Sequence, residues 1–353
     1  MPDLRDIGEH GIIERLKKYC ATADKMHYED AAIIKIPDSE YYLVYSIDSL
    51  PVHLPQQNPH GINKFRVAGR FLAAHTLSDI VCCGAQLFGF APNFILEENM
   101  DVTELDEFTE GIADILRKYD VQWETGDVKK GKPSCFVAFA WGLAKEIEVI
   151  RRCGARAGDL IVLTNRIGTG WAAYLARKFG VYNDLSSNSK DEIRQLETEP
   201  LLPYYPVRNC AIKGYISSGM DLTDGFADFL INIRNINNQG VKIYFQDDVL
   251  SMSAKEVASI LNVNPLGFLF EGGYDTPMVH AYTISQRYIE NCQDIFEKYK
   301  QPFIIIGEVV DNPNTFHVIV GKRKEEIPLI RDVQFENFED KWVNIFIKKG
   351  GRE

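Results

Sequence analysis

Acidic residues recur in short motifs that are spread along this chain of 353 residues. Each lies where a segment typical of a strand or a helix meets a loop. The set comprises Asp30, Asp48, Asp79, Asp127, Asp221 and Asp224. Carboxylates bind hard cations such as Mg²⁺, which proteins often share with the phosphates of a substrate. The pattern therefore predicts a pocket that binds a metal-associated phosphate.

Taken one at a time, these motifs have ordinary structural explanations. Asp224-Gly225 is a common turn sequence, and Asp30 and Asp79 are of a residue type that caps helices. The chain has no Gly-x-x-x-x-Gly-Lys-Ser/Thr phosphate loop, no His-Arg-Asp kinase motif and no Gly-x-Ser-x-Gly hydrolase motif. A nucleotide would therefore be bound through metal ions and carboxylates.

The order of the motifs is more informative than any one of them. Seven segments follow the order found in thiamine-monophosphate kinase and its relatives, and the chain resembles that family over most of its length. The segments are residues 8–13 (GEHGII), 29–32 (EDAA), 46–50 (SIDSL), 73–85 (AAHTLSDIVCCGA), 126–127 (GD), 152–159 (RCGARAGD) and 219–225 (GMDLTDG). The relatives include aminoimidazole ribonucleotide synthetase, selenophosphate synthetase and the hydrogenase maturation protein that dehydrates a carbamoyl group.

The acceptor-binding segment of the kinase is altered here. Where the kinase has GGEDYEL, this chain has GGYDTPM at residues 272–278, so Tyr274 and Pro277 replace two glutamates. The DGVGTK segment of the ribonucleotide synthetase has no counterpart, and neither has the N-terminal Cys or selenocysteine followed by Lys of the selenium enzyme. We therefore expect the nucleotide end of the kinase site to be kept and the acceptor to differ from thiamine phosphate.

The resemblance implies roles for individual residues. It places metal ligands at Asp30, Ser46, Asp48, Asp79, Asp127, Asp221 and Asp224, and it makes Asp221 and Asp224 the catalytic pair. It places ATP contacts at Gly126, Asp127, Arg152 and Thr223. It places acceptor contacts at His53, Tyr274 and Asp275, although a lone histidine in a loop is more often solvated than functional. An arginine fork suits phosphate oxygens, which fits the role implied for Arg152.

The reaction implied by the resemblance is transfer of the γ-phosphoryl group of ATP to a small-molecule acceptor, assisted by Mg²⁺. Phosphoryl transfer depends on alignment and charge neutralisation, which metal ions provide. Two alternatives stay open: an ATP-dependent ligase, cyclase or dehydratase that phosphorylates an amide or carboxyl oxygen, and a catalytically silent nucleotide binder. The resemblance also implies a homodimer in which strands of the N-terminal half form a barrel. Such a barrel would cover the exposed edge of a hairpin at residues 31–48.

Composition narrows the class of protein. The hydrophobic share of 45% and the charged share of 25% are ordinary globular values. A net charge of −11 disfavours general nucleic-acid binding, which needs clustered Lys and Arg. No apolar run is long enough to cross a bilayer, and the N-terminus lacks the apolar region of a signal peptide. We expect a cytoplasmic enzyme with neither nucleic-acid nor membrane partners.

The seven cysteines include no Cys-x-x-Cys pair, so neither a disulfide framework nor a zinc ribbon is indicated. The histidines show no zinc-binding spacing either. The adjacent Cys82 and Cys83 have two explanations. They are a redox or metal site, or they are small residues that fill a buried helix end, and the second explanation is favoured because free cysteine packs as a hydrophobe.

The strand and helix patterns predict an α+β fold with two α/β domains. The resemblance implies that both domains are PurM-like. It gives the N-terminal domain a mixed sheet and makes the C-terminal domain an α/β sandwich. We expect the domains to span residues 1–148 and 149–353. Strands are predicted at residues 31–36, 41–48, 86–96, 121–126, 135–143, 159–164, 241–245, 276–281, 303–309 and 316–320. Helices are predicted around residues 12–19 and at 65–83, 102–119, 171–179, 207–216, 253–261 and 285–299, with one more opened by Asp224 and a loop at 183–191.

Residues 168–173 (GTGWAA) compete with this interpretation because they match the Gly-x-Gly-x-x-Ala fingerprint of dinucleotide-binding folds. In that fingerprint the first glycine directly follows a strand, whereas residues 164–167 intervene here. No acidic residue closes a second strand about 20 residues later. We therefore favour a structural role, in which the glycines let the chain turn into a helix.

Overall fold

The structure is a computed structural model that describes residues 11, 12, 15, 16, 19, 29–50, 63–270 and 277–327. The described part is α+β and contains two sheets. It divides into two compact units. The six-stranded unit contains Asp30–Ile150 and Arg194–Gly214, and the seven-stranded unit contains Met1–Glu29, Arg151–Ile193 and Tyr215–Glu353. The domain limits predicted from sequence, residues 1–148 and 149–353, divide the chain into two continuous segments and stay a prediction.

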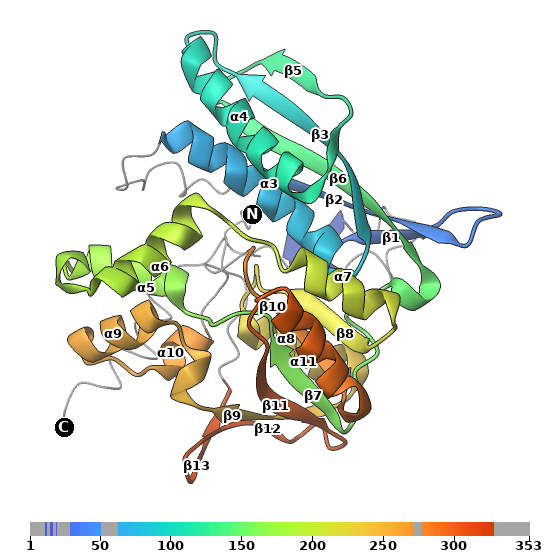
Figure 1. Cartoon of the computed structure of the whole chain (residues 1–353), viewed down its shortest axis with the longest axis vertical. Helices are drawn as coiled ribbons and strands as arrows, with labels where there is room; N and C mark the ends of the chain where they lie inside the picture. The colour runs from blue at the N-terminus through green and yellow to red at the C-terminus, as the bar shows by residue number, and fades with distance from the viewer. Residues whose placement is uncertain are drawn as a thin grey trace. The chain divides into compact units, whose positions relative to one another are not determined.

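The six-stranded unit is built on one mixed sheet (Figure 1). Its order is β1 (Ala32–Lys35), β2 (Tyr41–Ser49), β6 (Cys135–Lys145), β3 (Gln86–Leu96) and β4 (Gln122–Trp123), with β5 (Asp127–Lys130) also paired to β3. The predicted hairpin is confirmed as the antiparallel pair β1–β2, and β1 lies at the edge of the sheet. The helices of this unit are α3 (Lys64–Cys82), α4 (Val102–Tyr119) and α7 (Tyr204–Ile212), and η1 (Glu146–Glu148) is a single turn.

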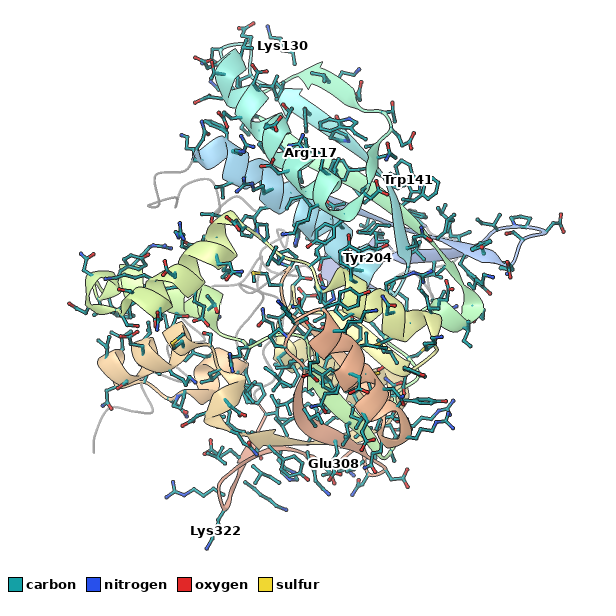
Figure 2. All side chains as sticks on the ribbon, in the orientation of Figure 1. Arg117, Lys130, Trp141, Tyr204, Glu308 and Lys322 are labelled. Carbon is teal, nitrogen blue, oxygen red and sulfur yellow. The ribbon has the colours of Figure 1, made fainter. Side chains whose placement is uncertain are left out.

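Strand alternation gives this sheet one covered and one open face. On β6, Ala138 and Ala140 are buried beneath α3, whereas Phe139 and Trp141, which alternate with them along the strand, are only half-buried. Successive side chains of a strand point to opposite faces, so the small residues let the helix approach and the aromatic ones lie on the other side. Trp141 stands on this open face and covers Gly89 of β3, where a Cβ atom would meet the indole ring (Figure 2).

The helices α3 and α4 pack closely because glycines stand at their contact. A Cβ atom on Gly69 would lie 1.9 Å from the carbonyl oxygen of Phe108, and one on Gly111 would lie 2.0 Å from that of Arg66. Asp101 caps α4, since its side chain accepts a hydrogen bond from the backbone N–H of Thr103 at 2.7 Å. These features fix the position of α3 over the sheet.

The seven-stranded unit has a mixed sheet. Its order is β13 (Arg323–Glu326), β12 (Phe316–Val320), β9 (Gly240–Phe245), β11 (Ile304–Val310), β7 (Asp159–Leu163), β10 (His280–Ser285) and β8 (Ile216–Asp221). Its helices include α5 (Thr169–Lys178), α8 (Phe226–Asn237), α9 (Met252–Leu261), α10 (Leu266–Leu269) and α11 (Ile289–Lys298), and the short turns are η2 (Tyr182–Asp184), η3 (Asp247–Val249) and η4 (Gln286–Tyr288). Figure 1 shows α5 beside α9.

The glycines of the competing fingerprint have a packing role. Gly168 has φ of 99° and stands just before α5. A Cβ atom there would lie 2.9 Å from the Cβ atoms of both Ala254 and Phe268. Glycine is therefore needed for the backbone conformation and for the close approach of α9 and α10.

The predicted loop at residues 183–191 is wrong, because most of this segment belongs to α6 (Ser187–Thr198). Ser186 precedes the helix, and its backbone N–H and hydroxyl both donate to the Glu256 carboxylate, at 2.9 and 2.8 Å. The fully buried Ile193 anchors the helix. A cluster of Ser, Asn and Asp is typical of loops, but the same residues also begin helices when a partner accepts their hydrogen bonds.

The predicted strand at residues 121–126 is also wrong in extent. The ladder is interrupted between β4 and β5, and Asp127 begins β5 instead of following a strand end. Phe90 and Asn93 of β3 pair with Trp123 and Asp127, so the β4–β5 side has one more residue than β3. An extra residue of this kind breaks strand pairing locally.

Four further boundaries differ from the prediction. The helix predicted at 207–216 ends at Ile212, because Gly214 has φ of 64° and turns the chain into β8. The strand predicted at 276–281 begins at His280, and the helix predicted from 285 opens with the turn η4. The helix expected to open at Asp224 has Gly225, with φ of 85°, as its N-cap. No helix in the described ranges is long and apolar enough to span a membrane.

Candidate functional site

Ser46, Asp48 and Asp79 form one cluster in the six-stranded unit. Ser46 and Asp48 are alternate residues of β2 and share the face that α3 covers. The Ser46 hydroxyl lies 2.5 Å from Oδ2 of Asp79 on α3 and 3.4 Å from Oδ2 of Asp48. His75 stands one helical turn before Asp79, and its Nε2 lies 3.8 Å from Oδ1 of Asp48. The structure thus brings together three of the predicted metal ligands.

The cluster suits a hard cation. Its donors are carboxylate and hydroxyl oxygens, which Mg²⁺ prefers over nitrogen or sulfur. Ser46 is buried, and the Asp48 side chain is 23% exposed, so the carboxylates stay reachable from solvent. Asp48 and Asp79 both contact one hydroxyl, and a divalent ion placed between them would offset the repulsion of their charges.

Asp30 lies at the C-terminal end of α3, beside thiols. Its Oδ2 accepts a hydrogen bond from Sγ of Cys82 at 3.0 Å. Cys82 is three residues after Asp79, so Asp30 stands about one turn along the helix from the Ser46 cluster. The ligand atoms of Asp30, Cys82 and Cys83 all lie within 4.8 Å of one another. The two cysteines are buried, as predicted for small residues at a helix end.

Asp127 is in a different environment. It is the first residue of β5, its side chain is 54% exposed, and it accepts a hydrogen bond from Lys129 Nζ at 2.9 Å. The preceding Gly126 is exposed and passes close to the backbone of Pro92. Asp127 therefore has a lysine partner in this structure.

In the seven-stranded unit, Asp221 ends β8 and is 1% exposed. The backbone N–H of Thr223 donates to its Oδ1 at 3.3 Å, and the Thr223 hydroxyl donates to the same oxygen. Asp224 is exposed, next to the glycine that opens α8. Two predicted ligands thus meet at one turn, with Thr223 bonded to the first of them.

His280 of β10 stands opposite Asp221 of β8 and is fully buried. Burial lowers its pKa from 6.5 to about 4, although the nearby Asp221 carboxylate acts in the opposite direction. Its Nδ1 lies 3.0 Å from the Tyr282 hydroxyl, and its backbone N–H donates to the Thr164 hydroxyl. His280 is therefore a neutral imidazole at neutral pH, placed to hold the Asp221 strand end.

The loop that carries Arg152 is held by two side chains that the sequence analysis did not assign. The Arg152 N–H donates to the Glu29 carboxylate at 2.8 Å. Asn237 of α8 donates to the Arg152 carbonyl at 3.0 Å and accepts from the N–H groups of Gly154 and Ala155. Glu29 carried a signal as the first acidic residue of EDAA, whereas Asn237 and His280 lie outside every motif. The predicted acceptor residues His53, Tyr274 and Asp275 lie outside the described residues.

Two family descriptions match consecutive parts of the chain. The N-terminal domain of AIR synthase related proteins matches residues 28–144, and the C-terminal domain matches residues 156–320. The chain belongs to the AIR synthase related family. The predicted membership is confirmed, as is a fold of two AIR-synthase-type domains with mixed sheets.

Two curated relatives illustrate the range of this family. A thiamine-monophosphate kinase of Buchnera aphidicola is 25% identical over 299 residues, which cover 84% of this chain and 88% of the kinase. A protein of Methanocaldococcus jannaschii, named for hydrogenase expression and formation, is 23% identical over 317 residues, which cover 85% and 86% of the two chains. Each match covers more than four fifths of both chains.

Solved structures of the family share the fold. AaThiL, solved as a complex with AMPPCP and TMP, superposes with a TM-score of 0.73 at 19% identity and covers 92% of this chain and 97% of its own. The hydrogenase maturation protein HypE, solved as a complex with ATP, has a TM-score of 0.65 at 18% identity and covers 87% and 90%. This AIR synthase related protein is thus thiamine-monophosphate-kinase-like in sequence and fold.

Proposed function

We propose that this protein is an ATP- and Mg²⁺-dependent kinase that transfers the γ-phosphoryl group to a small-molecule acceptor. The observation that carries the proposal is the Ser46 cluster, in which a strand and a helix present two carboxylates to one hydroxyl at 2.5 and 3.4 Å. The cluster occurs within the two motifs, SIDSL and LSDI, that resemble those of the kinase. The end-to-end similarity to thiamine-monophosphate kinases supports it.

In this proposal the chain holds the ion and the nucleotide with oxygen donors. Ser46, Asp48 and Asp79 bind Mg²⁺ in the six-stranded unit, and Asp30, Asp127, Asp221 and Asp224 are proposed as further ligands. The bound ion supplies charge neutralisation at the transferring phosphoryl group. Thr223 and Arg152 bind nucleotide oxygens, and Arg152 does so from the loop that Glu29 and Asn237 hold. His280 stays neutral at neutral pH and stands opposite Asp221 in the β8–β10 ladder.

The acceptor is proposed to differ from thiamine phosphate. Residues 272–278 read GGYDTPM, and both glutamates of the kinase segment are replaced. An acceptor bound beside Tyr274 and Asp275 meets a phenol and one carboxylate in place of three acidic groups. We therefore expect a less cationic acceptor than thiamine phosphate, with a hydroxyl or phosphate oxygen as the nucleophile.

Phosphorus NMR of the protein with ATP, Mg²⁺ and a panel of alcohols and phosphate monoesters tests this function. A new phosphoester or diphosphate signal that grows with ADP supports the kinase, and mass spectrometry identifies the acceptor. Asp79→Asn should abolish turnover, whereas Asp106→Asn, on an exposed position of α4, should retain it. Turnover that survives Asp79→Asn would contradict the assignment of the Ser46 cluster.

A second candidate is an ATP-dependent dehydratase or ligase that phosphorylates an amide or carboxyl oxygen. It is favoured by the likeness to a hydrogenase expression and formation protein and to HypE with ATP. The nucleotide site would be the same in both cases. The products differ, because a kinase releases ADP with a phosphorylated acceptor and a dehydratase or ligase releases free phosphate. A silent nucleotide binder would give neither product.

We also propose that the protein is a homodimer through the open face of the six-stranded sheet. Tyr45 and Phe139 lie 5.5 Å apart on this face, Phe139 and Trp141 lie 5.5 Å apart, and Ile47 is 63% exposed. An apolar aromatic face beside the edge strand β1 is typical of a surface that a partner covers. Sedimentation velocity tests it: Ile47→Glu should yield monomers, while Val102→Glu on α4, which is 71% exposed, should not.

A further inference from the structure

The vicinal thiols Cys82 and Cys83 lie beside the carboxylate of Asp30. Packing of small residues at a helix end does not by itself require that these three ligand atoms face one another. Sγ of Cys82 points to Oδ2 of Asp30 at 3.0 Å, and Sγ of Cys83 lies within 4.8 Å of both other ligand atoms. Neither cysteine forms a disulfide. Two sulfurs and one carboxylate oxygen thus converge on one small region at the end of α3.

The backbone around the thiols is fixed by hydrogen bonds. The Cys83 N–H donates to the Asp79 carbonyl at 3.2 Å and its carbonyl accepts from the Ile150 N–H at 2.9 Å. Gly84 follows with φ of 76°, and a Cβ atom there would lie 2.5 Å from the Glu148 carbonyl oxygen. Since the chain is held on both sides, the two thiols are presented without a large cost of ordering.

The distances suit tetrahedral coordination. Zinc binds thiolate sulfur at about 2.3 Å and carboxylate oxygen at about 2.1 Å, so two tetrahedral sulfurs lie about 3.8 Å apart and a sulfur and an oxygen about 3.6 Å apart. Sγ of Cys82 and Oδ2 of Asp30, now 3.0 Å apart, have to open by about 0.6 Å, and the other two pairs, which lie within 4.8 Å, have to close by at most about 1.2 Å. Side-chain rotation covers such a change without movement of the helix.

We propose that Asp30, Cys82 and Cys83 form a binding site for a thiophilic divalent ion of the Zn²⁺ class. Sulfur ligands select such ions over Mg²⁺, which prefers oxygen. Binding forms two metal–sulfur bonds and one metal–oxygen bond and releases the two thiol protons to solvent. Three protein ligands leave a fourth position for water or for a group of another molecule.

The site shares Asp30 with the proposed Mg²⁺ ligands. A thiophilic ion therefore withdraws this carboxylate from the nucleotide site, and we expect it to inhibit nucleotide binding. This consequence rests on the proposed function, whereas ion binding itself does not.

Titration of the full-length, metal-free protein with Co²⁺, without nucleotide, tests the site. Thiolate coordination gives an intense sulfur-to-cobalt charge-transfer band in the near ultraviolet, and Zn²⁺ should displace it at one equivalent. We expect the band to be lost in Cys82→Ala and Cys83→Ala and the affinity to fall about tenfold or more in Asp30→Asn, since even indirect support of a metal ligand is worth that much. Absence of the band in the unaltered protein, or an unchanged band in both cysteine variants, would overturn the proposal.

Cys153→Ala is the matched control because Cys153 is the exposed cysteine among those described. The band should be unchanged in this variant, and its loss there would assign the signal to adventitious binding. If a cysteine variant fails to fold, as judged by circular dichroism, the affinity of Asp30→Asn for Co²⁺ tests the site instead, because this substitution creates no cavity. A nucleotide-binding assay with Zn²⁺ then tests inhibition separately. Unchanged nucleotide binding in Zn²⁺ would contradict the link between the two sites but would not contradict the ion site itself.

Discussion

The Ser46 cluster predicts that the effect of Asp79→Asn on the free energy of unfolding changes sign when Mg²⁺ is added. Asp48 and Asp79 contact the same hydroxyl oxygen at 3.4 and 2.5 Å, so their nearest oxygens are no more than about 6 Å apart. Two like charges at that distance repel by about 0.7 kcal/mol at the dielectric constant of water and by about 3 kcal/mol at an effective value of 20. The cluster therefore holds two like charges whose repulsion a bound ion would relieve.

Asp79→Asn removes one charge and keeps an oxygen that accepts the Ser46 hydrogen bond. The weaker, uncharged hydrogen bond costs about 1 kcal/mol, so we expect the metal-free variant to be more stable than the unaltered protein by about 1 kcal/mol. With Mg²⁺ at 100 times its dissociation constant, the unaltered protein gains about 2.7 kcal/mol and the variant gains little. The order of stability should therefore invert.

Urea unfolding followed by circular dichroism, in EDTA and then in saturating Mg²⁺, measures both values. Asp106→Asn is the control and should follow the unaltered protein in both conditions, because Asp106 is exposed on α4. A metal-free Asp79→Asn that is less stable than the unaltered protein would refute the repulsion argument. An equal gain from Mg²⁺ in both proteins would refute the assignment of Asp79 as a ligand.

Three further perturbations follow from the structure. The depressed pKa of His280, about 4, means that its contribution to stability is present above pH 6.5 and is lost as pH falls towards 4. In EDTA the unfolding free energy should drop by about 2 kcal/mol from pH 7 to pH 5, and His280→Gln should remove this part of the slope. Asp114→Ala should cost about 2 to 3 kcal/mol, because the partly buried carboxylate accepts hydrogen bonds from both Arg66 and Arg70 at 2.8 to 3.0 Å; urea titration beside Asp106→Ala, at an exposed position of the same helix, measures it, and equal losses would contradict the network. Gly69→Ala should lower the melting temperature by several degrees, because its Cβ atom would meet the Phe108 carbonyl oxygen at 1.9 Å; an unchanged melting temperature would show that α3 and α4 separate without cost.

The local signals in the sequence were sufficient for much of the fold. The strands predicted at residues 41–48 and 135–143 and the helix predicted at 65–83 depend on signals a few positions apart, and each is confirmed within about two residues at its ends. Where two local signals had similar strength, the prediction was wrong. The Ser-rich start of α6 is typical of a loop until Glu256, far along the chain, accepts its hydrogen bonds.

For the candidate site, the sequence by itself determined the residue types and the order of the motifs, and with them the family. It also placed Ser46 and Asp48 on one face of a strand, since that follows from strand geometry alone. Only the tertiary structure decided which groups meet. Packing of α3 on β2 brings Asp79 to Ser46, and the chain entering β1 brings Asp30 to the thiols of Cys82 and Cys83. The pairing of β8 with β10 places His280 opposite Asp221. Such contacts join residues that are far apart in sequence, and they are set by how the elements pack, which no local pattern encodes.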